Sequence, residues 1–175
     1  MANPDESLDD IFKPDGQLRL ELLTESALVA IRESLRQARE THWDSVRSPH
    51  VFMGLLAVPD AGVRNWGERL GADIANILSQ FQELFRQEKG ECDAVLVLHR
   101  EFLSDNVIRP IREAHQRALD HHRTVVTPMD LLISMFTTPH SIVAECFEKI
   151  GVTAAKLTEL AVMAEVAAAT AERPL

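Results

Sequence analysis

The residues that could carry chemistry in this chain are its histidines, its two cysteines and a repeated pairing of a hydroxyl with a carboxylate. Of the seven histidines, the closest group is His115 with the adjacent His121 and His122. Their spacing matches neither HExxH nor the Cys/His patterns of zinc sites. Cys92 and Cys146 form no CxxC pair, and Cys146 occupies a helical apolar position that is typical of a core residue. The sequence therefore predicts no metal, no disulfide and no cofactor.

Sequence motifs for catalysis are also missing from the chain. It contains no GxSxG, no glycine-rich phosphate loop and no GxxxxGK[ST], which excludes ATP binding by the P-loop route. An unrecognised hydrolase stays open as an alternative if His42 or His122 lies buried beside a carboxylate and a nucleophile. The other interpretation of these two histidines is structural, because an imidazole at the end of a helix can satisfy terminal carbonyls. We expect a protein that is not an enzyme.

The most regular polar feature is a hydroxyl followed by a carboxylate, found in two places. One interpretation is helix capping, with the hydroxyl at the N-cap and the carboxylate in the first turn. The functional alternative is that the two helix starts form the rim of a groove for a peptide or an adaptor, because helix N-termini offer unpaired N–H groups. The candidate binding residues are Thr24, Glu25, Leu28, Ser104, Asp105 and Ile108.

These two places belong to an internal repeat with a spacing of 80 residues. Leu23–Ile77 aligns without a gap with Leu103–Leu157, and twelve aligned pairs are identical. A fixed spacing of this kind indicates a structural unit that completes its burial against a neighbouring copy. The identical pairs are Leu23/Leu103, Ile31/Ile111, Arg32/Arg112, Glu33/Glu113, Ala38/Ala118, His42/His122, Val46/Val126, Pro59/Pro139, Val63/Val143, Glu68/Glu148, Gly71/Gly151 and Ala75/Ala155.

Each copy is predicted to form four helices. In the first copy, Thr24 caps the first helix, and Ser48 caps a second helix that has Pro49 at its first position. Asp60 caps the third helix, Gly71 ends it in the left-handed conformation, and Asp73 caps the fourth. The second copy has the same signals, and we expect an all-α fold of two tandem four-helix repeats related by a pseudo-twofold.

Proline breaks the pattern in the second copy. Pro110 falls inside its first helix if that helix begins at Asp105, so the helix is either kinked there or begins late, near Arg109. Thr127 caps the next helix, Gly151 ends the third, and Thr153 caps the last.

Two segments outside the helices alternate apolar and polar residues or are rich in Val and Leu. Residues 17–22 follow a Pro-Asp-Gly turn, and residues 94–98 read Ala-Val-Leu-Val-Leu. They could pair as a small two-stranded ribbon, or lie on the helices as two extended linkers. The predicted boundaries are an acidic extension at 1–22, a double repeat at 23–166 and a flexible tail at 167–175. Within the double repeat, residues 23–88 and 103–166 are the copies and residues 89–102 the linker.

Charge and hydropathy narrow the class of partner. The chain has 175 residues and a net charge of −9, which disfavours nucleic acid and anionic membrane surfaces. No signal peptide or spanning segment is visible, so we expect a cytoplasmic protein that binds other proteins. The sequence assigns no oligomeric state.

The repeated pattern resembles the Clp amino-terminal repeat domain of Clp-type AAA+ unfoldases. The resemblance rests on [Thr/Ser]-acidic-x-x-aliphatic, a later His, a capped second helix rich in Leu and Phe, and Leu/Ile-Gly before a fourth helix. It extends from Leu23 to about Met163. The resemblance implies recruitment of unfolded substrates or adaptor proteins without chemistry, with a Clp-type ATPase as a further partner.

The second helix departs from the pattern of that family, Thr-x-Glu-His-Leu-Leu. The first copy has Pro49 where Glu is common, and the second copy has Met129 there. Some members of the family bind phosphorylated arginine through that Glu, and neither Pro49 nor Met129 can do so. With no ATPase module, the chain is expected to be a stand-alone accessory protein or a fragment of an unfoldase. The alternative is a regulatory interaction domain whose partner is unrelated to proteolysis.

Overall fold

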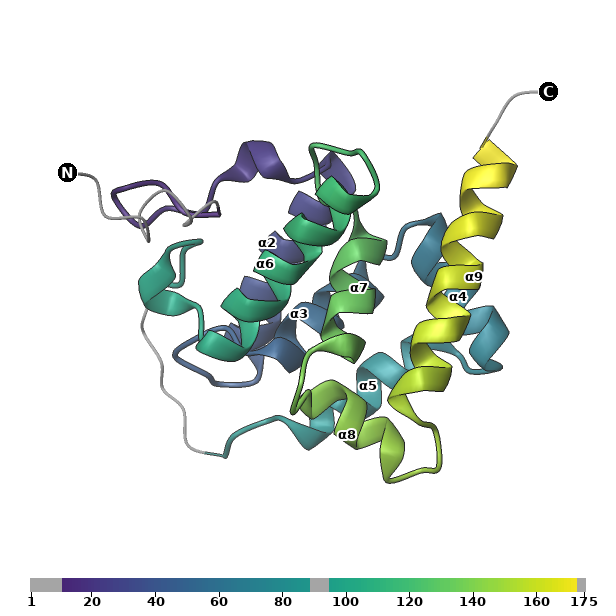
Figure 1. Ribbon diagram of the computed structural model, residues 1–175. Coiled ribbons are helices and arrows are strands. Elements are labelled where there is room, and N and C mark those ends of the chain that lie inside the picture. The colour runs from purple at the N-terminus through teal and green to yellow at the C-terminus, as the bar shows by residue number, and fades with distance from the viewer. Residues whose placement is uncertain (1–10, 89–94, 173–175) are drawn as a thin grey trace.

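The computed structural model describes residues 11–88 and 95–172 (Figure 1). This part of the chain consists of eight α-helices and two short 3₁₀ helices, without a sheet, so the prediction of an all-α fold is confirmed. The elements are η1 (Leu20–Leu22), α2 (Glu25–Glu40), α3 (Ser48–Ala57), α4 (Ala61–Leu70), α5 (Ile74–Leu84), η2 (Arg100–Phe102), α6 (Asp105–Asp120), α7 (Pro128–Thr137), α8 (Ile142–Glu148) and α9 (Ala154–Glu172).

Most helices begin and end where the sequence places a capping residue. The side chains of Thr24, Asp60 and Asp73 accept backbone N–H groups in the first turns of α2, α4 and α5. Gly71 and Gly151 adopt φ angles of 76° and 89° after α4 and α8, a conformation that glycine adopts without steric cost.

The cap of α3 is one residue earlier than predicted. Arg47 is the N-cap, and Ser48 is already helical. The Arg47 N–H donates to Nδ1 of His50 at 2.9 Å, so the histidine ring caps the helix in place of the serine hydroxyl. The Ser48 N–H donates instead to Oδ1 of Asn106, at 3.2 Å, in the other half of the chain.

Proline 110 lies inside α6, which begins at Asp105. The alternative of a late start near Arg109 is therefore wrong. Pro110 is buried on the core-facing side of the helix, and because it has no N–H it removes one hydrogen bond from the interior of α6.

The predicted two-stranded ribbon of residues 17–22 and 94–98 does not form in the part of the chain that the structure describes, and residue 94 lies outside that part. Leu20–Leu22 is the 3₁₀ helix η1. Among the described residues, the segments are joined by a 2.9 Å bond from the Leu18 N–H to the Leu98 carbonyl, beside an antiparallel bridge between Gln17 and His99. The turn explains this, because Gly16 bonds back to Lys13 and brings Phe12 onto Leu18, a pairing that replaces a longer ladder.

The two halves of the chain exchange backbone bridges at matching places. Leu23 pairs with Val126 and Val46 pairs with Leu103, both in parallel. Moving each residue by 80 positions turns one bridge into the other. The bounds of η1 and η2, of α2 and α6, and of α3 and α7 also differ by this spacing. These matches are what a pseudo-twofold requires, and the superposition of the two halves stays a prediction.

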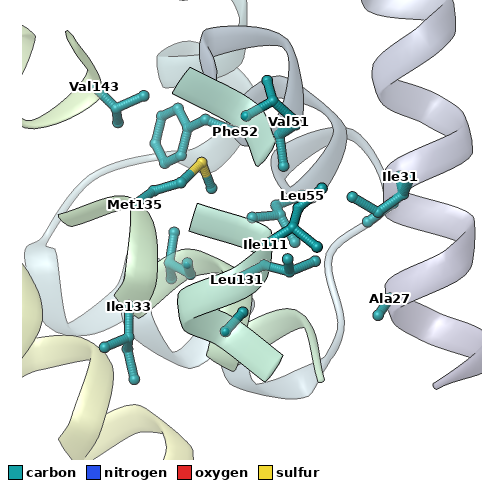
Figure 2. Close-up of a cluster of buried hydrophobic side chains, with 14 of the residues drawn as sticks. Ala27, Ile31, Val51, Phe52, Leu55, Ile111, Leu131, Ile133, Met135 and Val143 are labelled. Carbon is teal, nitrogen blue, oxygen red and sulfur yellow. The ribbon is translucent and has the colours of Figure 1, made fainter. Parts of the chain in front are cut away.

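One hydrophobic core is shared by both halves. The ring of Phe52 in α3 lies 4.8 Å from that of Phe81 and 6.0 Å from that of Trp66 in the first half. It also lies 6.3 Å from Phe136 and 5.9 Å from Phe147 in the second half. Aromatic rings at these distances and in edge-to-face arrangements stabilise the core beyond their area burial. Figure 2 shows Phe52 and Leu55 of α3 in one cluster with Ile111, Leu131 and Met135 of α6 and α7.

The last helix, α9, packs along α4 from the first half (Figure 1). The fully buried indole of Trp66 in α4 donates to the Leu157 carbonyl of α9 at 3.3 Å. α9 continues to Glu172, so the described part of the predicted tail, from residue 167, is helical. No helix in the described ranges is long and apolar enough to cross a bilayer.

Candidate functional site

The start of α2 holds three of the six predicted binding residues. Thr24 caps the helix, since its Oγ1 accepts from the Ala27 N–H at 3.1 Å, and its own N–H donates to the Val126 carbonyl at 2.9 Å. Glu25 is exposed in the first turn, and Leu28 is half-buried against the core. Thr24 therefore acts as a helix cap, whereas the side chain of Glu25 is exposed to solvent.

The start of α6 holds the other three. Ser104 is the N-cap, but its hydroxyl donates to Oδ1 of Asn106, while its N–H bonds to the Val46 carbonyl at 3.0 Å. Asp105 is exposed in the first turn, and Ile108 is buried in the core with 8% of its surface exposed. Ile108 therefore contributes packing, and Asp105 is the residue here that a ligand could reach.

A small pocket of about 260 Å³ lies at the start of α6, and of the six predicted residues only Asp105 lines it. We call it the α6 pocket; its wall includes Ser48, Asp105, Asn106, Arg109, Pro110 and His140. Arg109 is 3.9 Å from Glu113 and mostly exposed, which leaves its guanidinium available at the edge of the pocket. The start of α6 therefore lies beside a pocket that has both an acidic and a basic residue in its wall. Thr24, Glu25 and Leu28, at the start of α2, do not line this pocket.

A larger opening, which the sequence did not lead us to expect, lies between α5 and α8, and we call it the α5–α8 groove. Its volume is about 510 Å³, and its walls are Leu70, Ala72, Asn76, Ile77, Gln80, Phe81, Leu84, Cys146, Phe147, Lys149, Ile150 and Val152. Both copies contribute the turn that follows their third helix, at the repeat-related pairs Leu70/Ile150 and Ala72/Val152. The sequence signal that could have indicated this groove is the large aliphatic residues beside each glycine turn. Such turns are usually exposed to solvent, so apolar residues there are unusual.

A buried ion cluster joins α6, α7 and α9. Asp130 is fully buried and accepts bonds from Arg117 at 2.6 Å and from Arg123 at 2.5 and 2.8 Å. Burial by itself raises the pKa of Asp130, but bonds from Arg123, from the Thr127 N–H and from Arg117 outweigh it, so this pKa lies below its usual value. Arg117 also holds Glu165 of α9 through two bonds of 2.9 Å. The cluster is saturated internally, which makes it a structural clamp.

His50 is the corresponding residue in the first half and is also buried. Its Nδ1 accepts from the Arg47 N–H, and its Nε2 lies 3.1 Å from Oγ1 of Thr41. Burial, with a smaller contribution from the charge of Arg47, lowers the pKa of His50 to about 4. The ring is therefore neutral near pH 7, with its proton on Nε2.

Neither of the two repeated histidines is part of a catalytic arrangement. His42 and His122 are both exposed, and their backbone N–H groups close the ends of α2 and α6. The hydrolase alternative required one of them to be buried beside a carboxylate and a nucleophile, which is not the case. Within residues 11–88 and 95–172 there is also no group of three His, Cys, Asp or Glu side chains that could hold a metal ion.

The geometry defines a class of protein: an all-α domain whose two four-helix halves exchange bridges and share an aromatic core, with openings at its surface. A solved structure has the same architecture, the N-terminal domain of the caseinolytic protease-associated chaperone ClpD from Arabidopsis thaliana. The TM-score is 0.64 and the sequence identity 19%, over 85% of this chain and 97% of that domain. This chain therefore has the fold of a Clp N-terminal domain. No protein-family profile and no curated protein sequence matches it.

Proposed function

We propose that the chain is a non-catalytic, cytoplasmic module that binds proteins for a Clp-type unfoldase or protease. Its ligands would be partly unfolded substrates or adaptor proteins, and it would act as an accessory protein or as one part of an unfoldase. The observation that carries the proposal is the match to nearly the whole ClpD N-terminal domain, a domain of a protease-associated chaperone. A shared fold by itself is only an associational argument for function, so evidence for binding must also come from the surface of this chain.

The surface supports a binding role through two openings of different chemistry. The α6 pocket is rimmed by Asp105 and Arg109, and the α5–α8 groove is mainly apolar. Apolar walls give affinity for exposed hydrophobic segments, and a few polar groups at the rim give orientation. Pro49 and Met129 are both buried and carry no carboxylate, so we expect binding that does not depend on phosphorylated arginine.

The proposal is tested by capturing partners under native conditions and by measuring binding to a purified Clp-type unfoldase and to a permanently unfolded protein. We expect both to bind the wild-type chain. A Glu25→Lys/Asp105→Lys double variant tests the predicted helix starts, and it should stay folded because both side chains are exposed. If this variant loses its partners, the result supports binding at the starts of α2 and α6. If binding is unchanged, the binding site lies elsewhere on the chain. If neither an unfoldase nor an unfolded protein binds the wild-type chain, the proposed function is wrong.

A further inference from the structure

The α5–α8 groove exposes large apolar side chains that a folded chain would otherwise bury. Ile150 is 73% exposed, more than any other large hydrophobic residue in the described ranges, and Leu84 on the opposite side is 64% exposed. Single exposed apolar residues are ordinary, but apolar residues that surround one opening mark an interaction surface.

The floor of the groove is rigid because it is the edge of the aromatic core. Phe81 and Phe147 are 6% and 4% exposed, and their ring centroids lie 5.9 Å apart. Ile77, Phe81 and Leu84 follow one another at helical spacing along α5 and share the lining with Cys146 and Phe147 of α8. A preformed apolar channel between two helices accepts bulky side chains from an inserted segment without having to order itself first.

The charge at the rim of the groove indicates which charged group a bound segment would carry next to its apolar side chains. Lys149 is the one charged residue of the lining, and its ammonium forms no ion pair with any described residue. The amides of Asn76 and Gln80 lie on the α5 side. The single charge of the lining is thus positive, although the whole chain carries a net charge of −9. It complements a carboxylate on the ligand.

We propose that the α5–α8 groove binds an apolar segment of another polypeptide in which bulky aliphatic or aromatic residues are flanked by a carboxylate that pairs with Lys149. This inference rests on the proposed function, since it names the site and the chemistry of the bound segment. The apolar side chains supply the affinity, and the ion pair fixes the direction of the segment in the groove.

The test uses the full chain and three fluorescent peptides of equal length. The first peptide has Leu and Phe flanked by Asp, the second has Lys in place of each Asp, and the third has Ser in place of each Leu and Phe. Fluorescence anisotropy should show that the first peptide binds best, by about three- to fivefold over the second, the range of a partly exposed ion pair. Binding of the third peptide should be weaker by tenfold or more.

Variants then assign binding to the groove. Leu84→Ser/Ile150→Ser should weaken the first peptide by roughly tenfold, because its apolar side chains lose their contacts. Lys149→Glu should reverse the preference between the Asp and Lys peptides. Matched controls are Val166→Ser, at an aliphatic residue 60% exposed on α9, and Lys156→Glu, at an exposed lysine of the same helix; neither should change binding. All these side chains are exposed, so we expect the variants to fold.

A second readout locates the peptide directly. Cys146 lies in the groove wall, and in a Cys92→Ser chain it is the one remaining cysteine. Bound Asp peptide should slow alkylation of Cys146, whereas the Ser-containing peptide should not. The proposal is overturned if Leu84→Ser/Ile150→Ser binds as tightly as the wild type or if Cys146 is not protected. It is also overturned if Lys149→Glu leaves the preference unchanged, or if the groove proves to pair two copies of this chain, seen as dimers that Ile150→Ser abolishes.

The same samples separate failure of this site from failure of the proposed function. An unfolded protein that binds the wild type and the Leu84→Ser/Ile150→Ser variant equally would overturn the groove and leave the binding module intact. If the wild-type chain binds neither the peptides nor an unfolded protein, both proposals are wrong.

Discussion

At His42 and His122 the backbone is left-handed, with φ angles of 66° and 60°, although neither residue is glycine. His42 donates its N–H to the Arg39 carbonyl, and the next residue, Trp43, bonds back to Ala38. This pair of bonds is a Schellman motif, and the end of α6 has the same pair. The repeated histidines are thus explained by the backbone of a helix end. The interpretation from sequence, in which the imidazole satisfies carbonyls, does not describe either residue.

We expect His50 to make the stability of the fold depend on pH. The pKa of this buried ring is about 4 in the folded chain and near 6.5 when unfolded. Below pH 6.5 the unfolded chain takes up a proton that the folded chain refuses, so stability falls as the pH decreases toward 4. Urea unfolding should show a loss on the order of 2 kcal/mol between pH 7 and pH 5 from this residue.

The control for this prediction is His50→Gln, which keeps an acceptor for the Arg47 N–H but does not titrate in this range. The variant should lose less stability than the wild type over the same interval. Equal pH dependence of the two proteins would contradict a neutral, buried His50.

We expect Asp130→Asn to destabilise the chain strongly. The substitution removes the buried carboxylate that pairs with both Arg117 and Arg123 and leaves only Glu165 of this cluster to oppose their charges. Breaking a buried pair costs about 3 kcal/mol or more. Urea denaturation at pH 7 measures the loss. Asp120→Asn is the matched control on the exposed end of α6 and should change stability by less than about 0.5 kcal/mol. A loss of similar size in both variants would argue against the clamp.

At the scale of the elements, α2 and α3 approach each other closely through Gly54. A Cβ atom at this position would lie 2.3 Å from the backbone carbonyl oxygen of Ala30 and 3.0 Å from the backbone nitrogen of Ser34. The equivalent position in the second half is Ser134, so the two halves pack their first two helices differently. Backbone atoms cannot move aside as a side chain can, which makes Gly54 a requirement of this helix pair.

Gly54→Ala should therefore destabilise the chain by about 1–3 kcal/mol, although alanine is the better helix former. Gly67→Ala in α4 is the matched control, because its new Cβ would meet side-chain atoms of Ile74, at 2.5 and 2.8 Å, that can partly turn away. Thermal unfolding followed by circular dichroism should rank the loss at Gly54 above the loss at Gly67. The opposite order would be inconsistent with a backbone contact.

The helices also show which features of this fold could be predicted from the sequence and which could not. Local chemistry predicted the helix ends at Thr24, Asp60 and Gly71, because a cap acts within one turn. The cap of α3 is the ring of His50, a contact across only three residues that the Ser-Pro signal did not reveal. The segment before α2 became η1, and its neighbourhood is bonded to distant parts of the chain, at Leu98 and Val126. The α5–α8 groove was not predicted, because its walls come from parts of the chain that are far apart in sequence. It is bounded by helices from both halves, and no single stretch of sequence displays it.

At the scale of the whole molecule, neither half has a core of its own. Phe52 contacts rings from both halves, and α4 packs on α9. Separated halves would expose this apolar surface to water, and a single cooperative transition is the expectation for a core of this kind.

We expect fragments 1–88 and 95–175 to be unfolded alone and to regain helical structure when mixed. Circular dichroism measures helix content, and the fluorescence of Trp66, which is buried at the α4–α9 contact, reports docking. In the intact chain both probes should give the same urea midpoint. Cooperative unfolding of fragment 1–88 by itself would contradict a shared core.

The exchanged bridges have a consequence for how such a chain can vary. Thr41–Arg47 and His121–Thr127 connect the first and second helices of their halves, and each carries the valine that is held against the opposite half. An inserted or deleted residue in either connection would move that valine out of register, whereas most side-chain replacements would not. Loop length is therefore fixed more tightly than residue type. This accounts for two connections of equal length whose aligned residues, apart from the histidine and the valine, have all diverged.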